Sequence, residues 1–323
     1  MRILAAWQPR TALPATTDTE NEMATKATVH PCMPEAQYHA LPDLGSTTLR
    51  DISQHGALMA DRRRRAGVTP NDAMIFGTIV HALSLPQDQG GERMDWDPAA
   101  VEAELMRLGG CERYAVGPEA RRNSRAWTEW AAQQDEGVAL LKPSDIAATR
   151  DTARRALDCA HALQRCEPAA DLLWDALCER SILWTDEQTG LECKARIDAL
   201  TSNRSALVDL KVTTSADPAG FIGGRGIVWT RRYMLQAAYY LDAAILAGEA
   251  DHRTRCLYVA VHPEAPHPVG VYELPPEAIE IGRGMYRRAL NEWRSYLDQG
   301  GEAAALRAGW VRTAQIPGWV RTL

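Results

Sequence analysis

Two acidic residues and a lysine stand near the middle of the chain at a spacing that suits hydrolysis of a phosphodiester. One residue separates Asp209 from Lys211, and Asp198 precedes Asp209 by eleven positions. Lysine is scarce here, since only four of the 36 basic residues are lysines, and Lys194 and Lys211 are two of those four. A lysine ammonium is a compact charge whose pKa can be shifted, whereas an arginine fork stays protonated. A lysine that persists among arginines therefore indicates a need for an ammonium.

Two strands are expected to position these residues. Residues 191–200 and 206–212 are rich in apolar residues, and the polar run 201–205 between them is typical of a hairpin loop. If the two strands pair antiparallel, Asp198 and Asp209 lie close together near one end of the hairpin.

Side-chain direction on such strands would bring the reactive groups together. Residues two apart share a face, so Asp209 projects with Lys211, and Arg196 projects with Asp198. Two converging carboxylates need a hard cation, and oxygen ligands suit Mg²⁺ or Mn²⁺. A lysine beside that ion can orient or deprotonate a water and stabilise charge on a phosphate. The alternative is a surface hairpin whose Asp–Lys ion pair contributes little.

Other polar residues recur at helical spacing. Gly77 and His81 share a face of a helix expected after Pro70-Asn71-Asp72, and Gln236 and Tyr240 share a face of a helix expected over 231–246. The alternative for the histidine is a hydrogen-bonded core position, and for the other two it is packing onto the sheet.

Taken in chain order, these segments resemble the PD-(D/E)-x-K nuclease superfamily, and more closely its exonuclease VIII (RecE-type) branch. The resemblance covers the chain from about Tyr38 to its end. The matching segments are Tyr38-His39, Pro42, Ser46–Leu49, Gly77–His81, Glu179–Ser181 with Trp184, Cys193–Asp198, Asp209–Thr214 and Gln236–Tyr240.

The resemblance implies a metal centre on the two strands. It makes Asp198 and Asp209 metal ligands, adds the backbone carbonyl of Leu210 as a further ligand, and assigns Lys211 as the catalytic lysine. It also implies that His81 approaches the metal from the preceding helix. The implied ion is Mg²⁺ or Mn²⁺.

The resemblance further implies that Gln236 and Tyr240 line the substrate side of the site. Two positions depart from the pattern. Leu85 stands where RecB-like nucleases often have a glutamate, and Ala195 stands where a glycine precedes the first aspartate. The first departure leaves a fourth ligand open, with Glu179 as the nearest acidic candidate.

The implied activity is that of an exodeoxyribonuclease degrading one strand of duplex DNA from its end, 5′ to 3′, to leave single-stranded DNA for recombination. The implied assembly is a ring-shaped homo-oligomer, a trimer or tetramer, with a single-strand annealing protein (RecT-like) as partner in a phage or prophage module. The residues expected to bind DNA are Ser46, Thr48, Arg196, Arg225, Arg231 and Arg232.

Two other functions remain open on the sequence. The first is a RecB-like nuclease of CRISPR adaptation or end resection, which would need grouped late cysteines for an iron–sulfur cluster. Only Cys256 lies beyond Cys193, which counts against that function. The second is a DNA-binding module that has kept the fold and lost catalysis.

Composition sets broader limits on the chain. Its 323 residues are 46% hydrophobic, enough for a sizeable core, and no apolar run approaches the roughly 20 residues that span a bilayer. Seven cysteines without a Cys-x-x-Cys pair indicate a reducing compartment, the cytoplasm of a bacterium or of a phage-infected host. The net charge of −6 counts against a general nucleic-acid coat but allows a locally positive channel, with Arg62–Arg65 and Arg121-Arg122 as further candidates for its lining.

The expected fold class is α/β (α+β mixed), with a central mixed β-sheet flanked by helices. Residues 1–35 are expected to form a disordered leader and 36–323 a single exonuclease domain. That domain would comprise a helical front part (46–178), the catalytic sheet with flanking helices (179–300) and a tail (301–323). One capped helix is expected from Ser46 into the arginine run, and the Trp-rich segment 92–137 is not placed. The glycine run 223–226 lacks a following Gly-Lys-Ser/Thr, so no nucleotide cofactor is expected.

Overall fold

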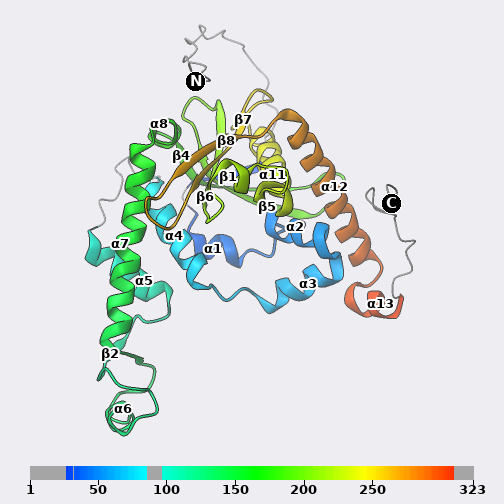
Figure 1. Cartoon of the computed structure of the whole chain (residues 1–323). Coiled ribbons are helices and arrows are strands. Elements are labelled where there is room, and N and C mark those ends of the chain that lie inside the picture. Colours follow the sequence, from blue (N-terminus) through cyan, green and yellow to red (C-terminus); the bar gives the residue numbers. More distant parts are fainter. Residues whose placement is uncertain (1–26, 32, 86–96, 309–323) are drawn as a thin grey trace, which may run out of the picture.

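A six-stranded sheet forms the centre of the computed structural model in Figure 1, which describes residues 27–31, 33–85 and 97–308. All neighbouring strands pair antiparallel except the fourth and fifth across the sheet, which are parallel. The expected fold class, a mixed sheet flanked by helices, is confirmed. In their order across the sheet the strands are β1 (Ala27–His30), β4 (Leu177–Thr185), β5 (Glu192–Leu200), β6 (Ala206–Val212), β7 (Arg255–Val261) and β8 (Val269–Glu273).

Helices cover one face of the sheet over a continuous apolar cluster that includes Leu49, Tyr239 and Trp293. Gly282 lets two of these helices pack closely, because a Cβ there would lie 2.1 Å from the Met234 carbonyl oxygen. The helices of this side are α2 (Ser46–His55), α3 (Ala57–Ala66), α11 (Tyr233–Leu246) and α12 (Pro276–Asp298), accompanied by the short α9 (Pro218–Phe221), α10 (Ile227–Thr230) and α13 (Gly301–Ala308). The short α1 (Glu35–Ala40) packs instead on Lys194 and Arg196 of β5.

A second apolar cluster, which includes Ile79 and Leu163, lies on the other face. It packs under α4 (Asp72–Ser84), α5 (Pro98–Leu108), α7 (Pro143–Arg165) and α8 (Glu167–Leu173). The helical part expected over 46–178 is thus divided between the two faces of the sheet.

An arm built on α7 projects away from the sheet (Figure 1). It carries α5, a small parallel sheet of β2 (Tyr114–Val116) and β3 (Ala139–Leu141), and α6 (Arg125–Ala131). The Trp-rich segment belongs largely to this arm, where buried Trp127 packs on Trp130 with ring centroids 5.0 Å apart. Residues 86–96 lie outside the described part.

Two expectations about the N-terminal region are corrected. Residues 27–30 of the expected leader form β1, which pairs with β4, while residues 1–26 lie outside the described part. The single helix expected from Ser46 is two helices, because Gly56 between α2 and α3 has a φ of +83° that a continuing helix does not allow. No described helix is both long and apolar enough to cross a membrane.

Candidate active site

The pairing of β5 with β6 stops where the two candidate aspartates face each other. Ala199 pairs with Val208 and Leu200 with Leu207, and the next position of this register would pair Asp198 with Asp209. Instead, Asp198 Oδ2 accepts a hydrogen bond from the Leu210 N–H at 2.9 Å. The expected hairpin is therefore present, with the two acids at its end. The Asp198 carboxylate accepts the hydrogen bond from the Leu210 N–H that a main-chain carbonyl of β5 would accept in a continuous ladder.

Glu179 extends this row of acids onto β4. In the β4–β5 register Cys178 pairs with Ala199 and Arg180 with Ile197, so Glu179 lies opposite Asp198. The φ of +54° at Glu179 interrupts the strand. On a regular strand Cys178 and Ile182, four residues apart, would point to the same face. Here Cys178 packs in the second apolar cluster and Ile182 in the first, so the interruption reverses the side-chain directions along β4. Burial and the nearby Asp198 carboxylate raise the pKa of Glu179.

Asp209 and Lys211 form a buried ion pair. The side chain of Asp209 is 5% exposed and that of Lys211 20%, and Asp209 Oδ2 contacts Lys211 Nζ. Gln236 donates from Nε2 to the other carboxylate oxygen of Asp209 at 2.7 Å. Lys211 Nζ also lies 5.3 Å from the ring centroid of Tyr233 and 6.0 Å from that of Tyr258. The lysine thus points into the site.

In the absence of a metal, the electrostatics of this pair make Asp209 easier to protonate and keep the amine of Lys211 charged. Burial raises the pKa of Asp209 to about 6, and the Asp198 carboxylate adds to the rise while Lys211 opposes it. Burial alone would lower the pKa of Lys211, but Asp209 and Asp198 outweigh it and leave that pKa raised. Lys211 is therefore an ammonium at neutral pH.

The donor atoms at this point suit a hard divalent cation. Asp198, Asp209 and the Leu210 carbonyl offer only oxygen, and Asp209 Oδ2 is buried against the Lys211 ammonium, a cation whose place a metal ion could share. A cation would offset the burial and the Asp198 repulsion that together raise the pKa of Asp209. No group of three His, Cys, Asp or Glu side chains within the described ranges is arranged around a common point as a metal cage. The set is thus two carboxylates and a main-chain carbonyl.

His81 reaches the two strands from α4, as expected. Its Nε2 lies 3.0 Å from the Leu210 carbonyl oxygen and its Nδ1 3.9 Å from Asp198 Oδ2. The imidazole therefore adjoins two of the three candidate ligand groups.

Tyr240 lies one helical turn after Gln236 on α11. Its hydroxyl accepts a hydrogen bond from Ser46 Oγ at 3.2 Å. Burial raises the pKa of Tyr240 to about 12, with Asp198 and Asp209 contributing. The phenol therefore stays protonated, and it ties α2 to α11 next to the acids.

The basic residues expected to bind DNA divide into occupied and unpaired groups. Arg196 pairs with Glu179 at 2.5 Å and donates to the Met33 carbonyl, and Arg232 donates to Ser53. Arg225 and Arg231 are exposed and form no ion pair within the described part of the chain, and Thr48 is half-buried.

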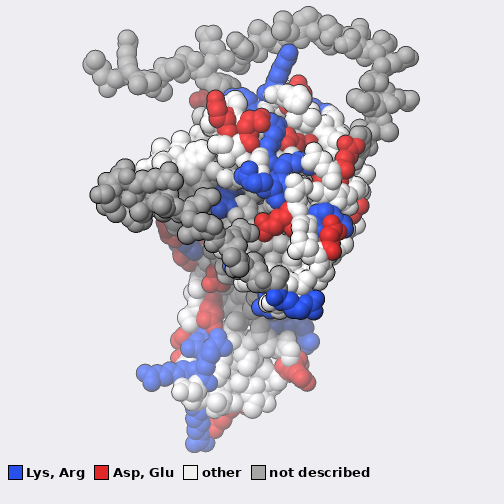
Figure 2. Space-filling model, turned by 90° about the vertical axis from the view of Figure 1, so that its right-hand side faces the viewer, with Lys and Arg blue, Asp and Glu red and all other residues white. Residues whose placement is uncertain are grey.

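The arginine run of α3 is largely neutralised by the protein itself. Arg62 and Arg65 pair with Glu302 of α13, and Arg63 pairs with Asp51. Arg64 contacts the Pro42 carbonyl. Figure 2 shows acidic and basic side chains interspersed on the face turned to the viewer. These contacts favour a structural role for the arginine run of α3. In the arm, Arg122 likewise forms an ion pair, with Asp145.

Lys194, the other lysine of the motif, has a structural position. Its Nζ donates to the carbonyl oxygens of Tyr38 and Leu41, each at 2.8 Å, and lies 4.7 Å from the Tyr38 ring centroid. Burial lowers its pKa. The scarcity of lysine thus marks one catalytic candidate and one residue that fastens α1 to β5.

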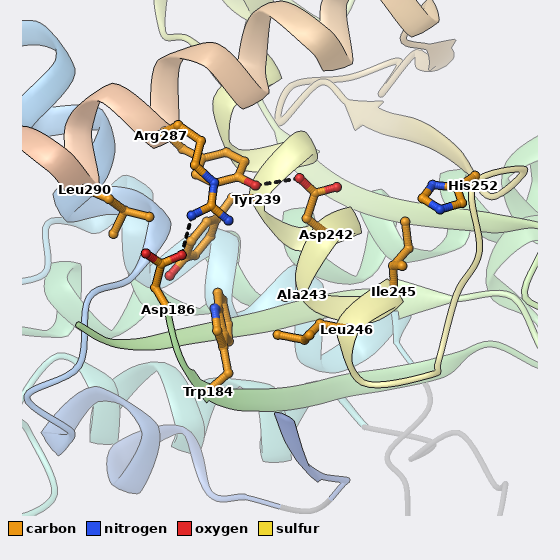
Figure 3. Close-up of a pocket in the computed structure, with 11 residues that line it drawn as sticks. Trp184, Asp186, Tyr239, Asp242, Ala243, Ile245, Leu246, His252, Arg287 and Leu290 are labelled. Atoms are coloured by element: carbon orange, nitrogen blue, oxygen red, sulfur yellow. Dashed lines mark hydrogen bonds and ion pairs between the residues drawn. The ribbon is translucent and has the colours of Figure 1, made fainter. Parts of the chain in front are cut away.

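A separate cavity of about 250 Å³ lies between β4, α11 and α12 (Figure 3). Its charged groups pair with one another or with residues beside it, Asp186 with Arg287 and Asp242 with Arg283. None of the candidate catalytic residues lines it, so it is not part of the site.

Two residues near the site were not anticipated from the sequence. The guanidinium of Arg50 lies 5.5 Å from the ring centroid of Tyr233, and that ring also contacts Lys211. Arg50 follows Ser46 by four positions, so the helical spacing applied to Gln236 and Tyr240 would have placed it on the same face of α2.

Comparisons with known proteins give one family. Residues 47–304 match the family described as a PDDEXK-like domain of unknown function (DUF3799). No sequence among curated proteins matches the chain. A crystal structure from Eubacterium rectale, of a protein described as a candidate exonuclease, is similar at a TM-score of 0.48 with 11% identity, covering 88% of this chain and 96% of the other.

Proposed function

The chain belongs to this PDDEXK-like family and carries its nuclease domain, and on that premise we propose that it is a metal-dependent exodeoxyribonuclease acting on the ends of duplex DNA. The observation that carries the proposal is the meeting of Asp198, Asp209 and Lys211 where β5 separates from β6. Oxygen ligands on two strands beside a buried ammonium suit phosphodiester hydrolysis, because a divalent ion and an ammonium together offset the negative charge that develops on the phosphate.

The ligands proposed for Mg²⁺ or Mn²⁺ are Asp198, Asp209 and the Leu210 carbonyl. A bound divalent ion would polarise a phosphoryl oxygen and acidify a water. Gln236 orients Asp209 by its hydrogen bond, and His81 supports Leu210 and Asp198.

Lys211 is proposed as the residue that stabilises developing charge on the phosphate. In the metal-free protein Asp209 and Asp198 raise the pKa of Lys211, which is therefore an ammonium and can donate to a phosphate oxygen. In the metal-free protein that ammonium is held on Asp209.

Finer features of the proposal come from the RecE-type resemblance. They are 5′ to 3′ polarity, production of single-stranded DNA for recombination, a ring-shaped trimer or tetramer, and a RecT-like annealing partner. The proposed setting is the cytoplasm of a bacterium or a phage-infected host.

The test uses purified protein, a linear duplex labelled at either its 5′ or its 3′ ends, and a closed circular duplex. With Mg²⁺, labelled nucleotides are expected from the linear duplex and no cut in the circle, with early release of the 5′ label. Cleavage of the circle, which has no ends, would show that the protein is an endonuclease and that the exonuclease proposal is wrong. Binding of DNA without cleavage in Mg²⁺ or Mn²⁺ would leave a catalytically silent binding module.

A further inference from the structure

Arg50 of α2 carries a charge that the described part of the protein does not neutralise. Its Nε is buried and has no hydrogen-bond partner, and its guanidinium forms no ion pair with any described residue. The adjacent carboxylate, Asp51, is engaged by Arg63 of α3. Buried donors in folded proteins are nearly always satisfied, so an unsatisfied one calls for an explanation.

The position of Arg50 follows from how α2 lies along α11. At one end Ser46 Oγ donates to the Tyr240 hydroxyl, and at the other Arg232 donates to Ser53. Arg50 lies between these two contacts, so its side chain faces the start of α11. That end of α11 is the end nearest Lys211.

Arg50 and Lys211 share one aromatic ring. The guanidinium carbon lies 5.5 Å, and the lysine Nζ 5.3 Å, from the ring centroid of Tyr233. A cation–π contact favours each cation separately, but two like charges held near one ring repel each other. An anion bound beside both cations would remove that repulsion and satisfy the buried Nε.

We propose that Arg50 binds a backbone phosphate of the DNA strand whose neighbouring phosphodiester lies at Asp198, Asp209 and Lys211. The guanidinium fork matches two phosphate oxygens. The choice of DNA as the source of the phosphate rests on the proposed function.

The experiment measures binding apart from cleavage. Fluorescence anisotropy with a blunt-ended duplex in EDTA gives Kd as NaCl is varied. Arg50→Gln is expected to raise Kd by about tenfold and to reduce the slope of log Kd against log salt by about one. The matched control is Arg113→Gln in the arm, an exposed arginine without an ion pair in the described structure, which is expected to change neither quantity.

A second variant separates charge from hydrogen-bond geometry. Arg50→Lys keeps a cation near Tyr233 but loses the fork, so a weaker Kd with an unchanged salt slope is expected. If Arg50→Gln binds DNA with the wild-type Kd and the wild-type salt slope, the assignment is overturned. If Arg50→Gln does not fold, a wild-type Kd in Arg50→Lys overturns the assignment instead.

If wild-type protein binds duplex with this Arg50 dependence yet never cleaves it, the exonuclease proposal falls and the phosphate site stands. If wild-type protein cleaves while Arg50→Gln binds normally, only the phosphate site falls.

Discussion

The carboxylate of Asp198 accepts a hydrogen bond from the main-chain N–H of Leu210, 2.9 Å away on the neighbouring strand. The carbonyl of the same leucine faces His81 at 3.0 Å. Both main-chain groups of Leu210 are therefore oriented by residues that the site would use, and β5 and β6 separate here. Asp198 thus has two separable functions, one as an acceptor for the backbone and one as a charge.

Replacing Asp198 should separate those functions. Asp198→Asn keeps an acceptor oxygen, so its free energy of unfolding is expected to stay close to that of the wild type. Asp198→Ala leaves the Leu210 N–H unsatisfied and is expected to lose about 1–3 kcal/mol. Both variants should lose metal-dependent cleavage. Urea unfolding followed by circular dichroism checks the first expectation, and equal stability of the two variants would contradict the structural function.

The Asp209–Lys211 pair should be strongly coupled. Lys211→Met leaves a buried carboxylate without its cation and is expected to cost about 3 kcal/mol of stability. Adding Asp209→Asn to Lys211→Met should recover much of that loss. Nuclease turnover should fall by at least about 100-fold in both variants, because neither has the ammonium. Additive stability changes in the double-mutant cycle would argue against the pair.

Stability should depend on pH through Asp209. Its pKa of about 6 in the folded protein exceeds the ordinary 3.8, so the folded state binds the proton more tightly than the unfolded state. In metal-free protein this contribution is complete below pH 3.8 and is lost as pH rises through about 6. Asp209→Asn should lack this dependence, which thermal melts across this pH range in EDTA would show.

Metal binding should depend on the same group in the opposite direction. A proton on Asp209 competes with a divalent ion, so the rise in Tm caused by Mg²⁺ or Mn²⁺ is expected to be small at pH 5 and large at pH 8. Asp209→Asn should show little rise at either pH. A metal-induced rise of equal size at both values in the wild type would remove Asp209 from the ligand set.

Lys194 should matter for folding of the N-terminal segment. Lys194→Met loses charge-assisted hydrogen bonds to two carbonyls and is expected to destabilise the protein by about 2 kcal/mol. Lys194→Arg should restore this only partly, since a planar fork does not fit where a compact ammonium bonds both carbonyls. Limited proteolysis within residues 33–41 and thermal melts measure the effect. The control is Lys142→Met at the start of α7, where a change below about 1 kcal/mol is expected from the Trp127 contact.

Strand periodicity and helical spacing were sufficient to anticipate the local arrangement of the site. Alternation on residues 206–212 places Asp209 with Lys211, and the hairpin brings Asp198 to Asp209. Four-residue spacing places Gln236 with Tyr240 on one face of α11. These relations are local, so short segments determine them before any long-range packing.

The sequence by itself therefore determined which groups could share a strand or a helix face, and which nuclease family they resemble. Tertiary structure alone decided which of those groups are already engaged. Lys194 and Lys211 look equivalent in the sequence, yet one is bonded to Tyr38 and Leu41 and the other to Asp209. Arg50 and Arg62 likewise differ in their partners, because Glu302 of α13 pairs with Arg62 and no described residue pairs with Arg50. The physical reason is that an ion pair or hydrogen bond needs two groups within a few ångströms of each other. Strand geometry sets that distance for Asp209 and Lys211, whereas only long-range packing sets it for Lys194 and the carbonyls of Tyr38 and Leu41.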